Sequence, residues 1–397
     1  MAAPVIREPD FPFTRTDPLS PPPEVAALRA AAPVTAVRLA GGQRAWLVTR
    51  HADVRAVLGD PRFSSDISRP GFPAVQAAAP AAVPPAAFMA LDPPRHTRYR
   101  SALINEFGTR RIAALRPAIR TLVDERIARM RAAGGPADLV EHLALPVPSL
   151  VICALLGVPF DHVDYFQQRS RVVLSRSATT GEVSRANREL AELIAGVIEA
   201  KRGEPGDDVL SRLIRHEAAF TVEEMTTMAV VLLTAGHETT ASMISFGVLN
   251  LVREPGVWAA MARHPERAGP VVEELLRLLT VIQFGVPRMA TADLVLGGVR
   301  IRAGDGVIAL LAGGNLDPDA YPDPGRLDPQ RSGPRHLAFG HGIHLCLGHS
   351  LARAELAIVF EAAFRAFPGL RMADPGQRVE FDENAFVYGP EKLIVDW

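Results

Sequence analysis

Cysteine and lysine are scarce in this chain of 397 residues, and both scarcities exclude classes of protein. The two cysteines, Cys153 and Cys346, are too few for a disulfide framework or for a four-thiolate iron–sulfur cluster. We therefore expect a protein of the reducing cytoplasm. The two lysines leave arginine to supply 41 of the 43 basic side chains, against 44 acidic ones. The net charge of −1 gives no overall field that would attract nucleic acid or an anionic membrane.

Long apolar segments are also missing. Residues 1–23 contain prolines and mixed charges but no apolar run, so neither a signal peptide nor a membrane anchor is predicted. The longest stretch without charge, residues 70–91, holds several prolines that would interrupt a membrane-spanning helix. The composition, 48% hydrophobic and 22% charged, is typical of a folded soluble protein. No linker divides the chain, so a single domain of residues 1–397 is predicted.

The periodicity of apolar residues predicts a mainly α fold with a minor β portion. Helical spacing dominates from residue 95 to residue 279. Residues 34–37 and 45–49 read as the two strands of a hairpin, and residues 288–307 as further short strands. Residues 68–91 are too irregular for one element. We expect them to form a lid over a binding site, with a disordered loop as the alternative.

One long helix carries an unusual segment in its middle. Thr221 and Glu224 fit a capping box, from which a helix can run to Arg253. It is apolar nearly all round and should be buried, yet residues 235–240 read Ala-Gly-His-Glu-Thr-Thr. Such residues suit the centre of a buried helix poorly. We interpret the segment as a groove for a small molecule with a proton-delivering acid and alcohol. A solvent-side patch is the alternative.

The second unusual segment, residues 339–348, reads Phe-Gly-His-Gly-Ile-His-Leu-Cys-Leu-Gly. Its glycines would let the backbone approach something flat and bulky. A helix is predicted directly after Cys346, and a helix N-terminus favours a thiolate, which is a soft metal ligand. Three interpretations compete for Cys346: an inert buried thiol, as expected for Cys153; a zinc site; and a thiolate beneath a planar macrocycle. The zinc site would use the histidines at 341, 344 and 349, but their spacing fits no common zinc pattern.

Four segments together resemble the cytochrome P450 family of haem-thiolate monooxygenases. Residues 339–348 match the family's Phe-Gly-x-Gly-x-His-x-Cys-x-Gly signature at every fixed position, and residues 235–240 match its oxygen-activation motif. Residues 274–277 match Glu-x-x-Arg, and residues 91–100 resemble the Asp-Pro-Pro-x-His-x-x-x-Arg stretch. The segments occur in the family's order, and the likeness extends from about residue 11 to the C-terminus. The nearest likeness is to soluble actinobacterial members that oxidise secondary metabolites.

This resemblance implies the cytochrome P450 fold, with haem b between the long central helix and the cysteine loop. Cys346 would be the axial ligand of the iron, and Thr239 and Glu238 would deliver protons to bound dioxygen. The remaining residues that would contact the haem are His96, Arg100, Arg288, His344, Ala235, Phe339 and Gly340. An ion-pair cluster behind the haem would consist of Glu274, Arg277 and Arg326. The sequence departs from the family's pattern at Leu327, after Arg326, and at Leu316.

The reaction implied is hydroxylation or epoxidation of a mid-sized to large hydrophobic small molecule with O2. Electrons would come from a separate ferredoxin and its NAD(P)H-dependent reductase, because the chain leaves no room for a flavin or cluster module. We expect a cytoplasmic monomer. Substrate contacts are expected from five segments: residues 67–89, 169–180, 230–235, 281–286 and 386–387. The alternatives are a haem-thiolate nitric oxide reductase, a peroxide-using oxygenase and a non-catalytic haem sensor.

Overall fold

Helices make up most of the structure. The computed structural model describes residues 8–75, 86–254 and 256–397. The α-helices are α1 (Pro23–Ala31), α2 (His51–Gly59), α3 (Arg95–Ile104), α4 (Thr109–Ala133), α5 (Pro146–Leu156), α6 (Val163–Leu174), α7 (Thr180–Gly203), α8 (Val209–Ile214), α9 (Val222–Arg253), α10 (Val257–Ala262), α11 (Ala268–Leu279), α12 (Leu311–Asn315) and α13 (His349–Ala366). The strands are β1 (Val34–Arg38), β2 (Arg44–Val48), β3 (Phe63–Ser64), β4 (Ala137–Asp138), β5 (Val286–Ala290), β6 (Leu294–Leu296), β7 (Val299–Ile301), β8 (Gly306–Ala309), β9 (Arg371–Met372) and β10 (Ile394–Asp396).

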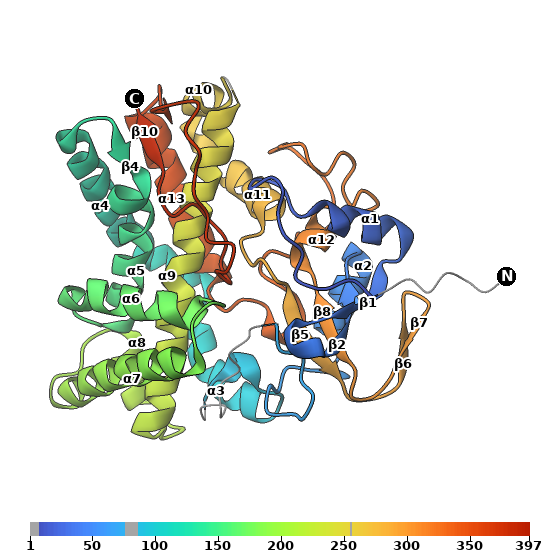
Figure 1. Ribbon diagram of the computed structural model, residues 1–397. Helices are drawn as coiled ribbons and strands as arrows, with labels where there is room; N and C mark the ends of the chain where they lie inside the picture. The colour runs from blue at the N-terminus through green and yellow to red at the C-terminus, as the bar shows by residue number, and fades with distance from the viewer. Residues whose placement is uncertain (1–7, 76–85, 255) are drawn as a thin grey trace.

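The helices and the main sheet occupy opposite sides of the molecule. Figure 1 shows α4 to α10 and α13 grouped on one side, with β1, β2, β5 and β8 on the other beside α1, α2 and α12. The five-stranded sheet has the order β1-β2-β8-β5-β3, and two smaller sheets pair β4-β10-β9 and β6-β7. The predicted mainly α fold with a minor β portion is confirmed. The predicted end of the helical region at residue 279 is also confirmed, because α11 ends at Leu279.

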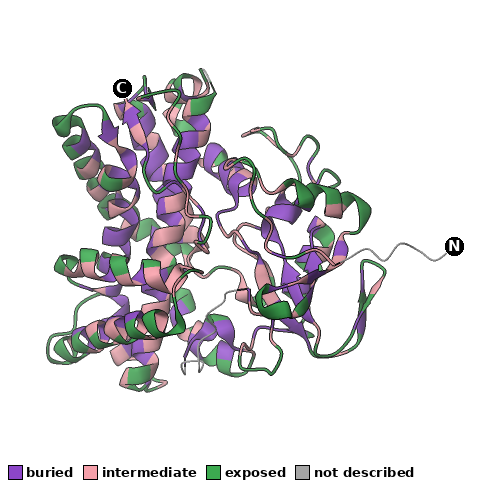
Figure 2. Cartoon of the chain, viewed as in Figure 1, coloured by how far each residue is buried: buried purple, intermediate pink, exposed green. Residues whose placement is uncertain are grey.

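The long helix α9 lies at the centre of the helical side. At its start, the Thr221 side chain accepts a hydrogen bond from the Glu224 backbone N–H, and the Glu224 side chain accepts one from the Thr221 N–H. This capping box satisfies two backbone donors that the helix itself leaves free. The helices α5, α7 and α13 pack against α9, and Figure 2 shows much of its length buried. The predicted long buried helix is therefore confirmed.

The predicted hairpin and short strands are also present. In β1 and β2, Val34 pairs with Val48 and Val37 with Ala45 in antiparallel register. β2 then pairs in parallel with β8, which is antiparallel to β5. Residues 76–85, in the middle of the predicted lid, lie outside the described residues. The part described after them contains a single 3₁₀ turn, Phe88–Ala90, so the lid stays a prediction.

One large apolar cluster unites the helices, and two smaller ones lie around the sheet. Cys153 of α5 is fully buried in the large cluster, and burial raises the pKa of its thiol to about 12. It is an inert core residue, as expected. In the described part of the chain, no helix combines the length and apolar character needed to cross a membrane.

Glu355 is an exception within this apolar interior. It lies on α13 with 2% of its surface exposed, and its Oε2 has no hydrogen-bond partner. Burial raises the pKa of this carboxyl well above its ordinary value. Glu361, two turns further along, instead pairs with Arg120 and Arg365. Burial works against ionisation there too, but the two arginines hold the pKa of Glu361 below its ordinary value.

We predict that Glu355→Gln stabilises the protein at neutral pH. The unfolded chain ionises Glu355 above pH ~4.3, whereas the folded state resists ionisation, so folding costs up to about 1.4 kcal/mol per pH unit above that value. The gain should shrink as the pH falls and vanish near the unfolded pKa. Glu361→Gln is the matched control and should lower stability at neutral pH. Urea unfolding of the holoprotein between pH 5.5 and 7.5 measures both differences. A loss of stability in Glu355→Gln at neutral pH would contradict the prediction.

Candidate active site

The middle of α9 presents an open face on an otherwise buried helix. Ala235 is exposed, although Leu232, Leu233 and Thr234 before it are buried. The Thr239 hydroxyl donates a hydrogen bond of 2.9 Å to the carbonyl oxygen of Ala235, one turn earlier. These two residues therefore share one face of the helix, as their spacing predicts.

On the other side of the same turn, α9 lies close to its neighbours. A Cβ added at Gly236 would lie 3.0 Å from Ile152 Cδ1 of α5, so this glycine allows two helices to approach. The next residue, His237, is fully buried and its Nδ1 lies 2.7 Å from the carbonyl oxygen of Leu233. Its ring meets Phe166 of α6 edge to face, with centroids 5.0 Å apart. The turn is thus fixed by packing on one face and open on the other.

Glu238 lies at the border of these two faces. Its side chain is 16% exposed, and its buried Oε1 has no hydrogen-bond partner. Two nitrogen atoms approach this oxygen without bonding to it: Arg171 Nε of α6 at 3.7 Å and His237 Nε2 at 3.6 Å. The carboxyl group is therefore near the Arg171 guanidinium and the His237 ring but is not locked in place by a hydrogen bond.

The cysteine loop holds Cys346 by its backbone. The Cys346 N–H donates to the carbonyl oxygen of Phe339 at 2.8 Å, and Gly340 takes a φ of +72°, which favours glycine. Gly342 also has a positive φ, and a Cβ there would meet the backbone of α2, so this glycine serves packing against α2. The helix expected directly after Cys346 begins only at His349, because residues 347–348 form a turn first. That expectation was wrong by two residues.

The Cys346 thiol is exposed, although it lies deep among protein atoms. The resulting desolvation raises its pKa, while the Gly348 N–H and the charges of Arg100 and Arg353 favour the thiolate. Coordination to a metal would complete the deprotonation. The zinc interpretation finds no support, because within residues 8–75, 86–254 and 256–397 no three His, Cys, Asp or Glu side chains could hold a metal together.

Four basic side chains converge near the cysteine loop. The rings of His96 and His344 lie 4.3 Å apart, and both nitrogens of His96 and Nε2 of His344 are buried without partners. Arg100 of α3 donates from Nη2 to the Leu345 carbonyl oxygen at 2.5 Å. Arg288 of β5 is 6% exposed and donates only to the carbonyl of Pro287 among the contacts described. We call His96, Arg100, Arg288 and His344 the cationic cluster.

Burial and mutual repulsion make the cationic cluster electrostatically unfavourable by itself. Burial, together with the charges of Arg288, His96 and Arg100, lowers the pKa of His344 to about 3. Burial also lowers the pKa of Arg288 to about 10. No member forms an ion pair with a carboxylate of the described residues. The charge of Asp92 acts on Arg288 and His96 but forms no ion pair with them. Buried donors and cations without an ion-pair partner fit an anionic group such as the carboxylates of haem, and one thiol fits its iron. The residues present therefore fit a haem.

The Phe339 ring is positioned by a cation and its counter-ion. The guanidinium of Arg353 lies 4.5 Å from the centre of the ring, and Arg353 Nε donates to Glu273 Oε1 at 2.5 Å. His336 Nε2 lies 3.1 Å from the other oxygen of Glu273. Burial opposes ionisation of Glu273, but these two partners lower its pKa to about 2. The structure thereby links α11, α13 and the start of the cysteine loop.

The buried ion-pair cluster differs from the expected one in one member. Glu274 and Arg277 of α11 pair at 2.7 Å, with 5% and 3% of their side chains exposed. The third side chain is Arg331, whose Nε lies 2.9 Å from Glu274 Oε1, and not Arg326. Arg326 contributes only its carbonyl oxygen, which accepts bonds from Arg277 and Arg331. The chain turns after Asp323, where φ is +49°, so the backbone of Arg326 faces the cluster.

Three of the segments expected to contact substrate lie together. The Phe386 N–H donates to the carbonyl of Leu174, at the end of α6, at 2.9 Å. The Tyr388 N–H donates to the carbonyl of Val281 at 2.8 Å, and Ile282 forms a β-bridge with Val387. Residues 169–180, 281–286 and 386–387 are thus joined through the C-terminal loop. Their contact with substrate stays a prediction.

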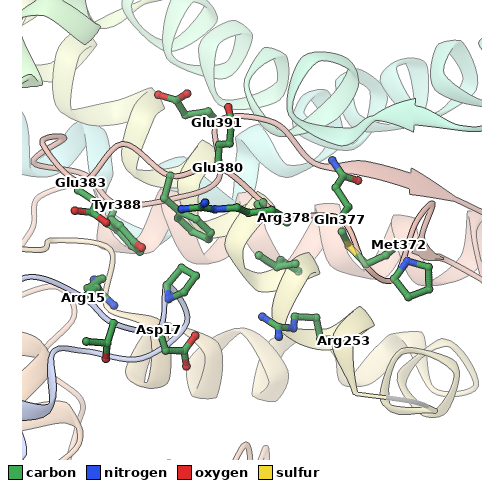
Figure 3. Close-up of a pocket in the computed structure, with 16 residues that line it drawn as sticks. Arg15, Asp17, Arg253, Met372, Gln377, Arg378, Glu380, Glu383, Tyr388 and Glu391 are labelled. Carbon is green, nitrogen blue, oxygen red and sulfur yellow. The ribbon is translucent and has the colours of Figure 1, made fainter.

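A separate polar cavity of about 820 Å³ opens beside the same C-terminal loop. Figure 3 shows arginines and carboxylates around it, including Arg15, Arg253, Arg378, Glu380 and Glu383. Neither Cys346 nor the open face of α9 lines it. Its mixed charges distinguish it from the cationic cluster.

A cysteine loop lies beside a cationic cluster, and a long buried helix opens at an acid–alcohol pair; this arrangement fits the class of proteins that bind haem. Comparison with known proteins supports the same class. The model of the family described as "Cytochrome P450" matches residues 269–397. Cytochrome P450-SU2 of Streptomyces griseolus is 42% identical over 100% of this chain and 97% of its own length. Pentalenic acid synthase of Streptomyces avermitilis is 42% identical over 98% of this chain and 97% of its own.

Comparison with solved structures gives the same family. The crystal structure of CYP105P1 in complex with filipin I superimposes with a TM-score of 0.93 at 39% identity, covering 98% of this chain and 99% of that one. This chain belongs to the cytochrome P450 family. It is a cytochrome P450 monooxygenase, an oxidoreductase whose family carries haem. The resemblance drawn from the sequence motifs is therefore confirmed.

The corrected ion-pair cluster yields a prediction with an internal control. Arg331→Ala removes charged hydrogen bonds to a buried carboxylate and to three carbonyl groups, and should cost about 3 kcal/mol of stability. Arg326→Ala keeps the backbone carbonyl and should cost less than about 1 kcal/mol. Denaturant unfolding of both variants measures the difference. Equal losses, or a larger loss in Arg326→Ala, would contradict the assignment.

Proposed function

We propose that this protein binds haem b through Cys346 and uses O2 with externally supplied electrons to hydroxylate or epoxidise a hydrophobic secondary metabolite. The single observation that carries the proposal is the exposed Cys346 thiol beside a cationic cluster that forms no ion pair with a carboxylate of the described residues. Arg100 belongs to both features, because its guanidinium lies against the cysteine loop and favours the thiolate.

The cationic cluster would hold the haem by its carboxylates. Each carboxylate would accept hydrogen bonds from donors that are already buried, so little further desolvation opposes binding. The negative charge would also remove the repulsion that now lowers the pKa of His344. Phe339 and Gly340 would lie against the haem on the side of the cysteine loop, and Ala235 on the side of α9. When bound, haem supplies the iron centre that activates dioxygen, and the thiolate ligand tunes it, as is general for this family.

Thr239 and Glu238 would guide protons to the open face of α9. The Thr239 hydroxyl donates its hydrogen to the Ala235 carbonyl, so its oxygen lone pairs remain free to accept a hydrogen bond. Glu238 lies at the border of the buried and open faces, with one buried oxygen and part of its side chain exposed. A carboxyl group in this place can exchange a proton with solvent and hand it toward the open face.

The names of the relatives support a substrate of secondary metabolism. They include a pentalenic acid synthase, a vitamin D3 dihydroxylase and a nocardicin C N-oxygenase, each 39–42% identical. Of the joined segments, residues 281–286 and 386–387 are largely apolar, which favours a mid-sized to large hydrophobic molecule. A ferredoxin and its NAD(P)H-dependent reductase would supply electrons to a cytoplasmic monomer. The paired Glu238 and Thr239 favour this chemistry over peroxide use.

Cys346→Ser tests the proposed ligand. The reduced, carbon monoxide-bound parent should show the red-shifted Soret band typical of a thiolate ligand, and the variant should lose both the band and monooxygenation. A serine oxygen donates less electron density to iron than a thiolate. Cys153→Ser is the matched control, because that thiol lies in the apolar core. Its spectrum should be unchanged, with a stability loss of about 1–3 kcal/mol from the buried hydroxyl. A thiolate spectrum retained in Cys346→Ser would remove the assignment.

Thr239→Ala tests the proposed path for protons. The variant should bind haem and substrate as the parent does, but divert electrons into hydrogen peroxide and form product at least tenfold more slowly. Thr240→Ala changes the neighbouring buried hydroxyl and should leave the ratio of product to NAD(P)H consumed unchanged. Product and peroxide are measured per NAD(P)H oxidised. Product formation in Thr239→Ala at the parent's rate and without extra peroxide would refute the role.

A further inference from the structure

His237 and Glu238 each place one buried atom without a hydrogen-bond partner close to the other. His237 Nδ1 lies 2.7 Å from the Leu233 carbonyl oxygen, which can only accept, so Nδ1 carries the hydrogen of this bond. A neutral His237 therefore has an unprotonated Nε2. That atom is buried without a partner, and it lies 3.6 Å from Glu238 Oε1, which is also buried without a partner.

Two acceptors at this distance repel each other unless one proton lies between them. An ionised Glu238 facing a neutral His237 would leave both buried atoms unsatisfied, which destabilises the folded state. One proton removes the conflict, either as an imidazolium beside a carboxylate or as a neutral imidazole accepting from a carboxylic acid. Arg171 at 3.7 Å is the one other ion-pair contact of Glu238 in the described part of the chain. The helices α5, α7 and α13, which also pack on α9, contribute none there.

We propose that His237 and Glu238 share one proton at neutral pH, and that His237 is the positioning residue that keeps Glu238 supplied with it. This inference rests on the proposed role of Glu238 in proton delivery. When the proton lies on Nε2, it first passes to Oε1, and the Glu238 carboxyl then releases this one proton toward the open face. The pair then carries one negative charge, His237 keeps its Nδ1–H, and solvent returns one proton through the exposed part of Glu238.

The packing around His237 suits this role. Its ring is held by the bond to Leu233 and by the edge of Phe166, so Nε2 is fixed in place, 3.6 Å from Oε1. Glu238 has no such restraint, and a small rotation of its side chain can close the 3.6 Å gap. His237, whose ring is fixed, therefore stores the proton, and Glu238, whose side chain can rotate, transfers it toward the open face.

The first test observes the shared proton directly in the resting holoprotein. Nitrogen-15 NMR of labelled histidines reports whether His237 Nε2 is protonated or accepts a hydrogen bond, and infrared spectroscopy reports whether Glu238 is a carboxylic acid. We expect one of these two signatures at pH 7, and its loss in Glu238→Gln, which has no dissociable proton. A His237 with unprotonated, unbonded Nε2 beside an ionised Glu238 from pH 5 to pH 9 would overturn the inference.

The second test separates this inference from the proposed function. His237→Asn keeps a donor for the Leu233 carbonyl but removes Nε2, and His237→Gln covers the case in which Asn does not fold. Either should produce several-fold more hydrogen peroxide per NAD(P)H than the parent, increasingly so as the pH rises from 6.5 to 8.5. Ser245→Ala, which removes a similar bond to a carbonyl on α9, is the control and should leave the pH profile unchanged.

The outcomes for Glu238 and His237 are distinguishable. If Glu238→Gln couples electrons to product as well as the parent does, the proposed role of Glu238 fails. If Glu238→Gln loses coupling but the histidine variants follow the parent at every pH, only the role of His237 fails.

Discussion

The arrangement of the molecule depends on burying the apolar surface of α9 on every side except at one turn. A helix of 32 residues that is apolar nearly all round has to be surrounded by other helices, and α5, α7 and α13 pack against it. The place where this cover is missing, at Ala235 and Thr239, is therefore informative. On a surface helix, an exposed alanine would be ordinary. At the centre of a long helix that its neighbours otherwise cover, it marks the face that a ligand has to cover.

The cationic cluster is the electrostatic counterpart of this open face. Folding brings His96, Arg100, Arg288 and His344 together from α3, β5 and the cysteine loop, and none of them forms an ion pair with a carboxylate of the described residues. Apolar packing elsewhere has to offset the cost of burying the two guanidinium groups, and burial together with the neighbouring charges lowers the pKa of His344 to about 3. The burial of Leu103 and Tyr99 on the apolar side of α3 is part of this compensation. An anionic cofactor would then stabilise the folded chain by more than its own contacts, since it also relieves the repulsion.

The sequence predicted the elements that depend on local patterns. It was least accurate where a backbone turn determines which side chain reaches a site. The capping box of α9 and the hairpin of β1 and β2 follow from nearby residues, and both were predicted. The third member of the ion-pair cluster was not. Arg326 stands where the family motif places an arginine, but the turn after Asp323 points its carbonyl inward and leaves the place to Arg331. Neither the unpartnered atoms of the cationic cluster nor the link from Arg171 to Glu238 has a signal in the sequence, because each joins elements distant along the chain.

Three buried or half-buried glutamates show how one side chain serves different purposes according to its partners. Glu274 accepts hydrogen bonds from Arg277, Arg331 and the Asp328 backbone, and these hold its pKa below the ordinary value although burial opposes them. Such a carboxylate is fixed and cannot give or take a proton. Glu355 has an unpartnered oxygen but is enclosed on all sides, so its proton has no route out. Glu238 alone of these three combines an unsatisfied buried oxygen with an exposed edge. Incomplete hydrogen bonding, which would be a defect in the scaffold, is at this position the property that a proton carrier requires.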